Sequence, residues 1–147
     1  MKIYIGADHQ GFQLKAELVD YLRRSHYDIV DEGDAVLRPE DDFPQFAGRV
    51  AQAILADSDD DSRGILICGS GQGMCMAANR FKGIRASLVW DVHEARTARN
   101  DDDSNVLCLP ARILKSDRSE AIIHTWLNTP FAGAPRFKRR LKEMDQF

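Results

Sequence analysis

The fold of this 147-residue chain is decided by one stretch, Gly64-Ile65-Leu66-Ile67-Cys68-Gly69-Ser70-Gly71-Gln72-Gly73-Met74. Its first half is a continuous apolar run, which is typical of a parallel strand covered on both faces. Its second half is a glycine-rich loop followed by a helical pattern. Alternating glycines let successive backbone N–H groups point into one concavity, and such a concavity suits an anion. The stretch therefore predicts a strand–loop–helix unit that carries Cys68 at the tip of the strand.

Further apolar runs surround this unit and alternate with amphipathic helical patterns. We expect strands at Lys2–Gly6, Tyr27–Val30, Gly64–Cys68, Arg85–Val89 and Asn105–Leu109. We expect helices on the apolar stripes from Phe12 to Leu22 and from Phe46 to Ile54, from about Gly73, from about Asp91, and over Ser116–Leu127. This alternation predicts an α/β fold: a three-layer α/β/α sandwich around a Rossmann-like, five-stranded parallel sheet with right-handed crossovers.

Length and composition indicate a single domain over residues 1–147, because a chain of this size buries one sizeable core. Gly133-Ala134-Pro135 breaks the chain before a basic helix expected at about residues 135–146. The acidic patch Asp57–Asp61 is expected to be a solvated loop.

Charge and hydropathy exclude two classes of partner. The net charge of −3 gives no sign of nucleic-acid binding. No apolar run approaches the roughly 20 residues of a membrane span, and no signal peptide is visible, so we expect a cytoplasmic protein. Three unpaired cysteines fit a reducing compartment, and the four scattered histidines suggest no metal site. Cys75 and Cys108 are expected to be core residues.

Polar residues follow several of the expected strands at their carboxyl ends, where ligands bind in such folds. Asp8 and His9 follow the first strand, the Cys68 loop follows the third, Asp91 the fourth and Arg112 the fifth. A thiolate is favoured beside a helix N-terminus. With the loop amides as an oxyanion hole, Cys68 could take a proton next to a carbonyl and generate an enediolate.

Other interpretations of these residues stay open at this point. The glycine loop alone also fits a structural turn with a core cysteine, and His9 alone fits a structural or surface role. Arg136 and Arg140 lie four positions apart and share a helix face. They fit either a solvated basic helix or a phosphate clamp, since guanidinium groups match phosphate oxygens. A dinucleotide site is disfavoured, because its G-x-G-x-x-G pattern belongs after the first strand.

Taken together, the motifs resemble the ribose-5-phosphate isomerase B and galactose-6-phosphate isomerase family over nearly the whole chain. The resemblance rests on Ile5–Phe12, Asp42-Phe43-Pro44, Gly64–Met74, Ala77-Ala78-Asn79-Arg80, Asn105–Leu109 and Arg136–Arg140. It implies an aldose–ketose isomerase that acts on a phosphorylated sugar, ribose 5-phosphate above all, without metal or cofactor. It also implies a homodimer or homotetramer whose active sites combine residues of two subunits.

The resemblance implies a role for each matching residue. Cys68 is the base, and Ser70 stands where the family has threonine. Asp8 and Asp101 are counted with the catalytic residues and Asp102 with the substrate-binding residues. The anion hole is assigned to Gly69, Gly71, Gln72 and Gly73, and the phosphate to His9, Arg112, Arg136 and Arg140. Relatives that lack the cysteine use a glutamate at the far end of the loop. That position is Met74 here, which implies the cysteine variant.

One departure from the family pattern concerns sugar-ring opening. Asp101 stands at the position of the histidine that helps to open a furanose, and Asp102 at an asparagine. A carboxylate only accepts hydrogen bonds, although the like charges of Asp102 and Asp103 leave an acid role open. A tetrose 4-phosphate cannot close a furanose ring, so an enzyme for such a substrate needs no ring opener. Phe43 and Phe137 replace a tyrosine and a histidine.

Three function hypotheses follow from the sequence. The first is an active isomerase of a pentose 5-phosphate, with a tetrose 4-phosphate or a hexose 6-phosphate as alternative substrates. The second is a non-catalytic subunit that supports a related active chain. The third, a nucleotide-binding module, lacks the first-strand fingerprint.

Overall fold

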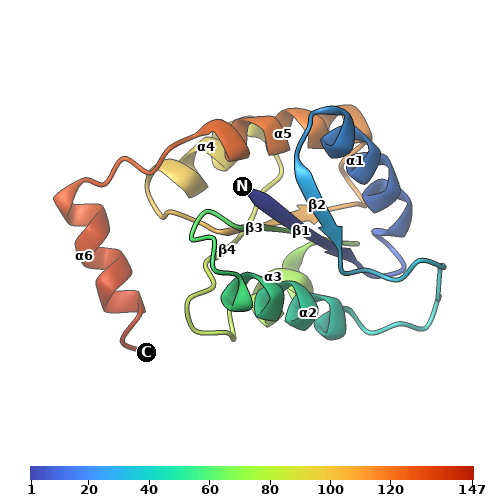
Figure 1. The fold of residues 1–147 in the computed structure, drawn as a ribbon, viewed down its shortest axis with the longest axis horizontal. Helices are drawn as coiled ribbons and strands as arrows, with labels where there is room; N and C mark the ends of the chain where they lie inside the picture. The colour runs from blue at the N-terminus through green and yellow to red at the C-terminus, as the bar shows by residue number, and fades with distance from the viewer.

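A five-stranded parallel sheet forms the centre of the molecule, described for residues 1–147 by a computed structural model (Figure 1). Its strand order is β2-β1-β3-β5-β4. The strands are β1 (Lys2–Ala7), β2 (Asp28–Asp31), β3 (Arg63–Cys68), β4 (Ala86–Leu88) and β5 (Val106–Pro110). The helices are α1 (Phe12–Arg24), α2 (Phe43–Ala56), α3 (Gln72–Ala78), α4 (Val92–Asn100), α5 (Ser116–Asn128) and α6 (Pro135–Met144). The predicted fold is confirmed.

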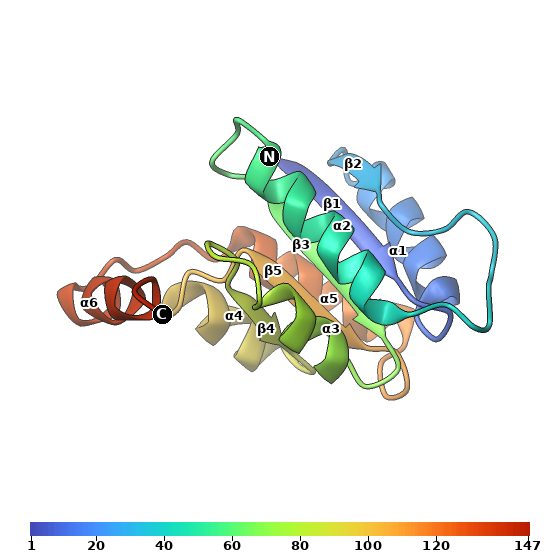
Figure 2. The same cartoon turned by 90° about the horizontal axis from the view of Figure 1, so that it is seen from below.

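Helices cover both faces of the sheet, with α1, α4 and α5 on one side and α2 and α3 on the other (Figures 1 and 2). Successive strand residues point to opposite faces, so each strand supplies both layers. In β3, Ile65 and Ile67 pack with the first helix layer, whereas Leu66 and Cys68 pack with the second. Cys68 is therefore part of the core beneath α2 and α3.

The edge strand β4 is shorter than the sequence predicts. Arg85 lies outside it, because its backbone N–H donates to the side-chain oxygen of Asn105 at 2.7 Å. Next to it, the Asn79 amide donates to the Ala86 carbonyl at 2.9 Å and accepts from the Ala86 N–H at 2.8 Å. Asn79 thus occupies the outer side of β4 as a further strand would. The second strand is also displaced by one residue, to Asp28–Asp31.

Two smaller expectations are corrected. The Asp57 side chain is not simply solvated, because it accepts hydrogen bonds from the hydroxyls of Tyr4 at 2.8 Å and Ser62 at 2.7 Å. Cys108 is fully buried as predicted, but Cys75 is only partly buried.

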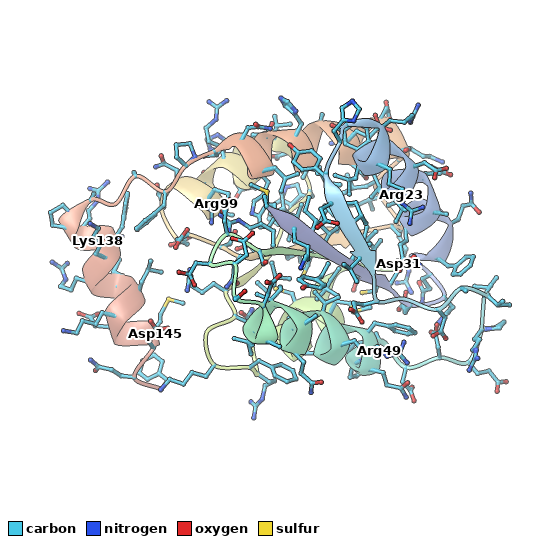
Figure 3. The ribbon with its side chains drawn as sticks, in the orientation of Figure 1. Arg23, Asp31, Arg49, Arg99, Lys138 and Asp145 are labelled. Carbon is cyan, nitrogen blue, oxygen red and sulfur yellow. The ribbon has the colours of Figure 1, made fainter.

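The last helix, α6, stands apart from the other helices at one end of the molecule (Figures 1 and 2). Phe137 is its one buried residue and lies 6.5 Å from the ring of Phe131. Figure 3 labels Lys138 on this helix and Asp145 directly after it, both well away from the sheet. None of the helices combines the length and the apolar character that crossing a membrane requires.

Candidate active site

Cys68 is the last residue of β3 and is only 5% exposed. The backbone N–H of Gly71 points at its sulfur, with an N–Sγ distance of 3.2 Å. This contact requires the turn at Gly71, whose φ of 74° lies in the left-handed region that favours glycine. An N–H directed at sulfur stabilises negative charge there, which is what a thiolate base needs.

The rest of the loop contains backbone amides that differ in whether they are free to bind an anion. The amide of Gln72 donates to Ser70 Oγ at 3.4 Å, so the amides of Gly71 and Gln72 are both engaged within the loop. The amides of Gly69, Ser70 and Gly73 have no acceptor in the chain. Phe43 lies against Gly73, where an added Cβ would be 2.7 Å from the ring. The sequence predicted that the amides of Gly69 to Gly73 face an anion, and in the free chain the amides of Gly69, Ser70 and Gly73 are available for this role.

Asp8 also lies at the carboxyl edge of the sheet, and its side chain stabilises a turn there. Its Oδ1 accepts the N–H groups of Gln10 at 3.0 Å and Gly11 at 3.1 Å, which closes the turn after β1. Burial raises the pKa of the Asp8 carboxyl, and the two amide donors oppose that shift. Asp8 therefore holds the turn that carries His9.

His9 and Arg112 are the two basic side chains beside the Cys68 loop. His9 Nδ1 lies 2.7 Å from Asp41 Oδ1. Arg112 Nε donates to Gln10 Oε1 at 2.9 Å, and both groups lie over Gly69. The sequence reasoning missed Asp41 and Gln10. Gln10 could have been found from the sequence, because it follows His9 within a motif that matches the family. Asp41 lies 32 positions from His9, and no sequence pattern links the two residues.

The remaining predicted residues lie at the other end of the sheet. Asp101 and Asp102 precede β5 and therefore lie at its amino end, whereas Cys68 is aligned with Pro110 at the carboxyl end. Five residues of β5 separate the two edges by about 13 Å. Arg136 and Arg140 are exposed on α6, and the charge of Arg140 acts on Asp102. One copy of the chain thus does not bring Cys68 and the arginine pair together.

The three aspartates at this amino edge differ in their surroundings. Asp103 pairs with Arg85 at 2.8 Å and Arg99 at 2.7 Å and is structural. Asp101 accepts from the side-chain amide of Asn100 at 2.7 Å. Desolvation, followed by the negative charge of Asp101, raises the pKa of the Asp102 carboxyl. Asp102 also lines a groove of about 580 Å³ that reaches Met144 and Phe147 near the end of the chain.

A parallel α/β sheet whose carboxyl edge carries a thiol, an amide loop and two basic side chains fits the chemistry of a sugar-phosphate isomerase. A sequence model of the Ribose/Galactose Isomerase family matches residues 3–144, and the chain belongs to this family. This confirms the resemblance noted from the motifs.

Individual relatives agree with this assignment. The chain is 42% identical to a probable ribose-5-phosphate isomerase B of Mycoplasma pneumoniae, over 93% of this chain and 89% of that protein. It superposes on a ribose 5-phosphate isomerase of Thermotoga maritima with a TM-score of 0.94 and 39% identity, covering 99% and 98% of the two chains. The Mycoplasma genitalium ribose-5-phosphate isomerase B, solved with bound ribulose-5-phosphate, gives a TM-score of 0.93 at 38% identity, covering 99% and 94%.

Proposed function

We propose that this protein interconverts ribose 5-phosphate and ribulose 5-phosphate through a cis-enediolate, with Cys68 as the base. The observation that carries the proposal is the sulfur of Cys68, held by the Gly71 N–H beside an amide loop at the ligand-binding edge of the sheet. The structural relative with bound ribulose-5-phosphate supports the choice of substrate.

The mechanism assigns each group a step. Cys68 removes the C2 proton of the aldose and returns it at C1 of the enediolate. The amides of Ser70 and Gly73 donate to the developing oxyanion. His9 and Arg112 bind the phosphate and hold the substrate along the loop. We place the enzyme in the cytoplasm and expect it to need no metal.

We further propose that two copies of the chain form each active site. This proposal is supported by the separation of Cys68 from Arg136 and Arg140 at opposite edges of the sheet. It is also supported by α6, which projects from the body with exposed arginines on its surface (Figure 3). In a homodimer, the α6 helix of one copy would place these arginines on the phosphate held by the other, and a homotetramer would contain two such pairs.

A tetrose 4-phosphate is the second candidate substrate. The observation that favours it is Asp101, whose carboxylate accepts a hydrogen bond from Asn100 and is thus placed as an acceptor, not as the proton donor of ring opening. Desolvation and the charge of Asp101 raise the pKa of Asp102, so its carboxyl holds a proton more readily than an ordinary aspartate does. If Asp101→His leaves turnover of ribose 5-phosphate unchanged, the ring-opening account of this position loses its support.

The test is turnover of the purified protein, with a chelator present, on ribose 5-phosphate, erythrose 4-phosphate, allose 6-phosphate and galactose 6-phosphate. Fast turnover of ribose 5-phosphate supports the proposal, and activity confined to the tetrose selects the second candidate. Inactivity on all four substrates would instead indicate a non-catalytic partner subunit. Loss of activity on chelation, restored by added metal, would contradict metal independence.

A further inference from the structure

Asp41 is a carboxylate to which the proposed mechanism gives no role, although it contacts the mechanism's His9 at two atoms. Its Oδ1 accepts the backbone N–H of His9 at 3.0 Å and lies 2.7 Å from Nδ1 of the His9 ring. The Asp41 side chain is 8% exposed and that of His9 is 32% exposed. The carboxylate thus fixes both the backbone and the ring of His9 and leaves Nε2 as the free end.

Asp41 is itself held in place. It belongs to the connection between β2 and α2, residues 32–42, which runs around one side of the molecule (Figure 1). The near end of this connection is anchored by buried Lys15, whose Nζ lies 2.5 Å from Asp31 Oδ2. The far end is anchored by Phe43, which lies against Gly73. The Asp41 N–H donates to the Arg38 carbonyl at 3.2 Å. Asp41 therefore faces His9 from a segment fixed on both sides.

The other carboxylate near His9 does not compete for this role. Oδ1 of Asp8 is committed to the N–H groups of Gln10 and Gly11. Asp41 is thus the carboxylate bonded to the ring. A phosphate dianion accepts hydrogen bonds and does not donate them. A ring that bridges a carboxylate and a phosphate must therefore carry hydrogen on both nitrogens, which only the cationic imidazolium does.

We propose that Asp41 is a positioning residue that makes His9 a cationic, doubly protonated donor to the substrate phosphate. This inference rests on the proposed function, because that function places the phosphate at His9.

The experiment compares Asp41→Asn with Glu40→Gln, which removes a neighbouring exposed charge that makes no hydrogen bond or ion pair with the site. The first probe is inorganic phosphate, whose binding is measured by calorimetry without any turnover. We expect Asp41→Asn to weaken phosphate binding about tenfold, the loss of one charge-assisted contact, and Glu40→Gln to bind as the wild type does. The same substitution should raise KM for ribose 5-phosphate about tenfold and change kcat less than about twofold.

Two further readouts separate positioning from loop stability. With phosphate bound, ¹⁵N spectra should show hydrogen on both ring nitrogens of His9 in the wild type and on only one in Asp41→Asn. Combined with His9→Asn, the Asp41 substitution should cost no further affinity.

Three results would overturn the inference: an Asp41→Asn protein that binds phosphate as Glu40→Gln does, a full additional loss on the His9→Asn background, or a wild type that binds phosphate no better than His9→Asn. Failure of the proposed function would appear differently, as a wild type that binds phosphate but isomerises no sugar phosphate.

Discussion

Cys68 combines two environments that rarely coincide. Its side chain belongs to the core layer under α2 and α3, yet its sulfur receives the N–H of Gly71 at the ligand-binding edge. In the proposed mechanism, burial keeps water away from the proton that Cys68 removes, and the Gly71 amide compensates for the negative charge that burial would penalise. Of the other two cysteines, Cys108 is enclosed in the core, whereas Cys75 accepts the side-chain N–H of Asn79 at 3.7 Å and donates its own S–H to the Ala86 carbonyl at 3.3 Å.

Replacement of the thiol tests its role directly. Cys68→Ser should lower kcat on ribose 5-phosphate by about 10²- to 10⁴-fold, because a hydroxyl is a far weaker base in the same place. The matched control, Cys75→Ser, should change kcat less than about twofold. Steady-state kinetics and thermal melts of both variants provide the comparison. Undiminished turnover in a folded Cys68→Ser protein would exclude the cysteine base.

At the scale of elements, the turn between β3 and α3 is the most constrained part of the chain. Gly71 has a positive φ, and a Cβ at this position would also collide with Leu88. By contrast, Gly48 lies within α2, where an added Cβ would make an ordinary 3.6 Å contact with Phe81. The two glycines therefore predict opposite responses to alanine.

Gly71→Ala should lower the free energy of unfolding by about 1–3 kcal/mol and reduce kcat, because the strained turn withdraws its amide from Cys68. Gly48→Ala should raise that free energy by about 0.5–1 kcal/mol through helix propensity, with kcat unchanged. Chemical denaturation of both variants measures the difference. Equal stability of the two would show that the left-handed turn is not required.

The contacts of Asp57 predict a pH dependence of stability. The Ser62 hydroxyl, the Asp59 amide and the Tyr4 hydroxyl hold the pKa of Asp57 well below its ordinary value of 3.8. Because the folded-state pKa is depressed, the stabilisation is present above about pH 4 and is lost as the pH falls below that value.

Asp57→Asn should therefore lower Tm at about pH 7, and its difference from the wild type should shrink at about pH 3. Asp60→Asn removes a nearby charge with no such contacts and should show little change at either pH. Thermal melts of the wild type and both variants between about pH 3 and about pH 7 measure these Tm differences. A Tm difference that stays constant with pH would show that the carboxylate charge is not the source.

The sequence predicted the elements better than the contacts between distant segments. Continuous apolar runs located β3 and β5, and the glycine pattern located the turn after Cys68, because both signals are local. The shortened β4 depends on side chains of Asn79 and Asn105 that complete its hydrogen bonds. The His9–Asp41 pair depends on the path of a long connection, which no local pattern encodes.

At the scale of the whole molecule, the decisive feature is the distance between the two parts of the site. The thiol and the amide loop lie at the carboxyl edge, whereas α6, the helix that contains Arg136 and Arg140, lies beyond the amino edge (Figure 2). For Asp101, the chain order already implied that it lies at the edge opposite Cys68, because Asp101 precedes β5 and Cys68 ends β3. The resemblance supplied the interpretation that a second copy joins them.

Replacing an arginine of the Arg136 and Arg140 pair should impair substrate binding and not the chemical step. Arg140→Ala should raise KM for ribose 5-phosphate by roughly tenfold to a hundredfold and leave kcat within about threefold, because the phosphate is held equally in ground and transition states. Arg139→Ala is the matched control: Arg139 is the preceding exposed residue on α6 and pairs only loosely with Glu143, at 3.8 Å. If both variants had equal kinetic constants, Arg140 would not be a substrate-binding residue.

The most direct test of a site shared between copies is a heterodimer with one Cys68→Ser chain and one Arg140→Ala chain, isolated with two different affinity tags. Turnover is measured at a ribose 5-phosphate concentration at which both parent homodimers are nearly inactive. The account predicts about half of the wild-type turnover per dimer, since one of the two sites then holds an intact thiol and an intact arginine. A heterodimer as inactive as its parents would contradict the account, because it would place Cys68 and Arg140 in the site of the same copy.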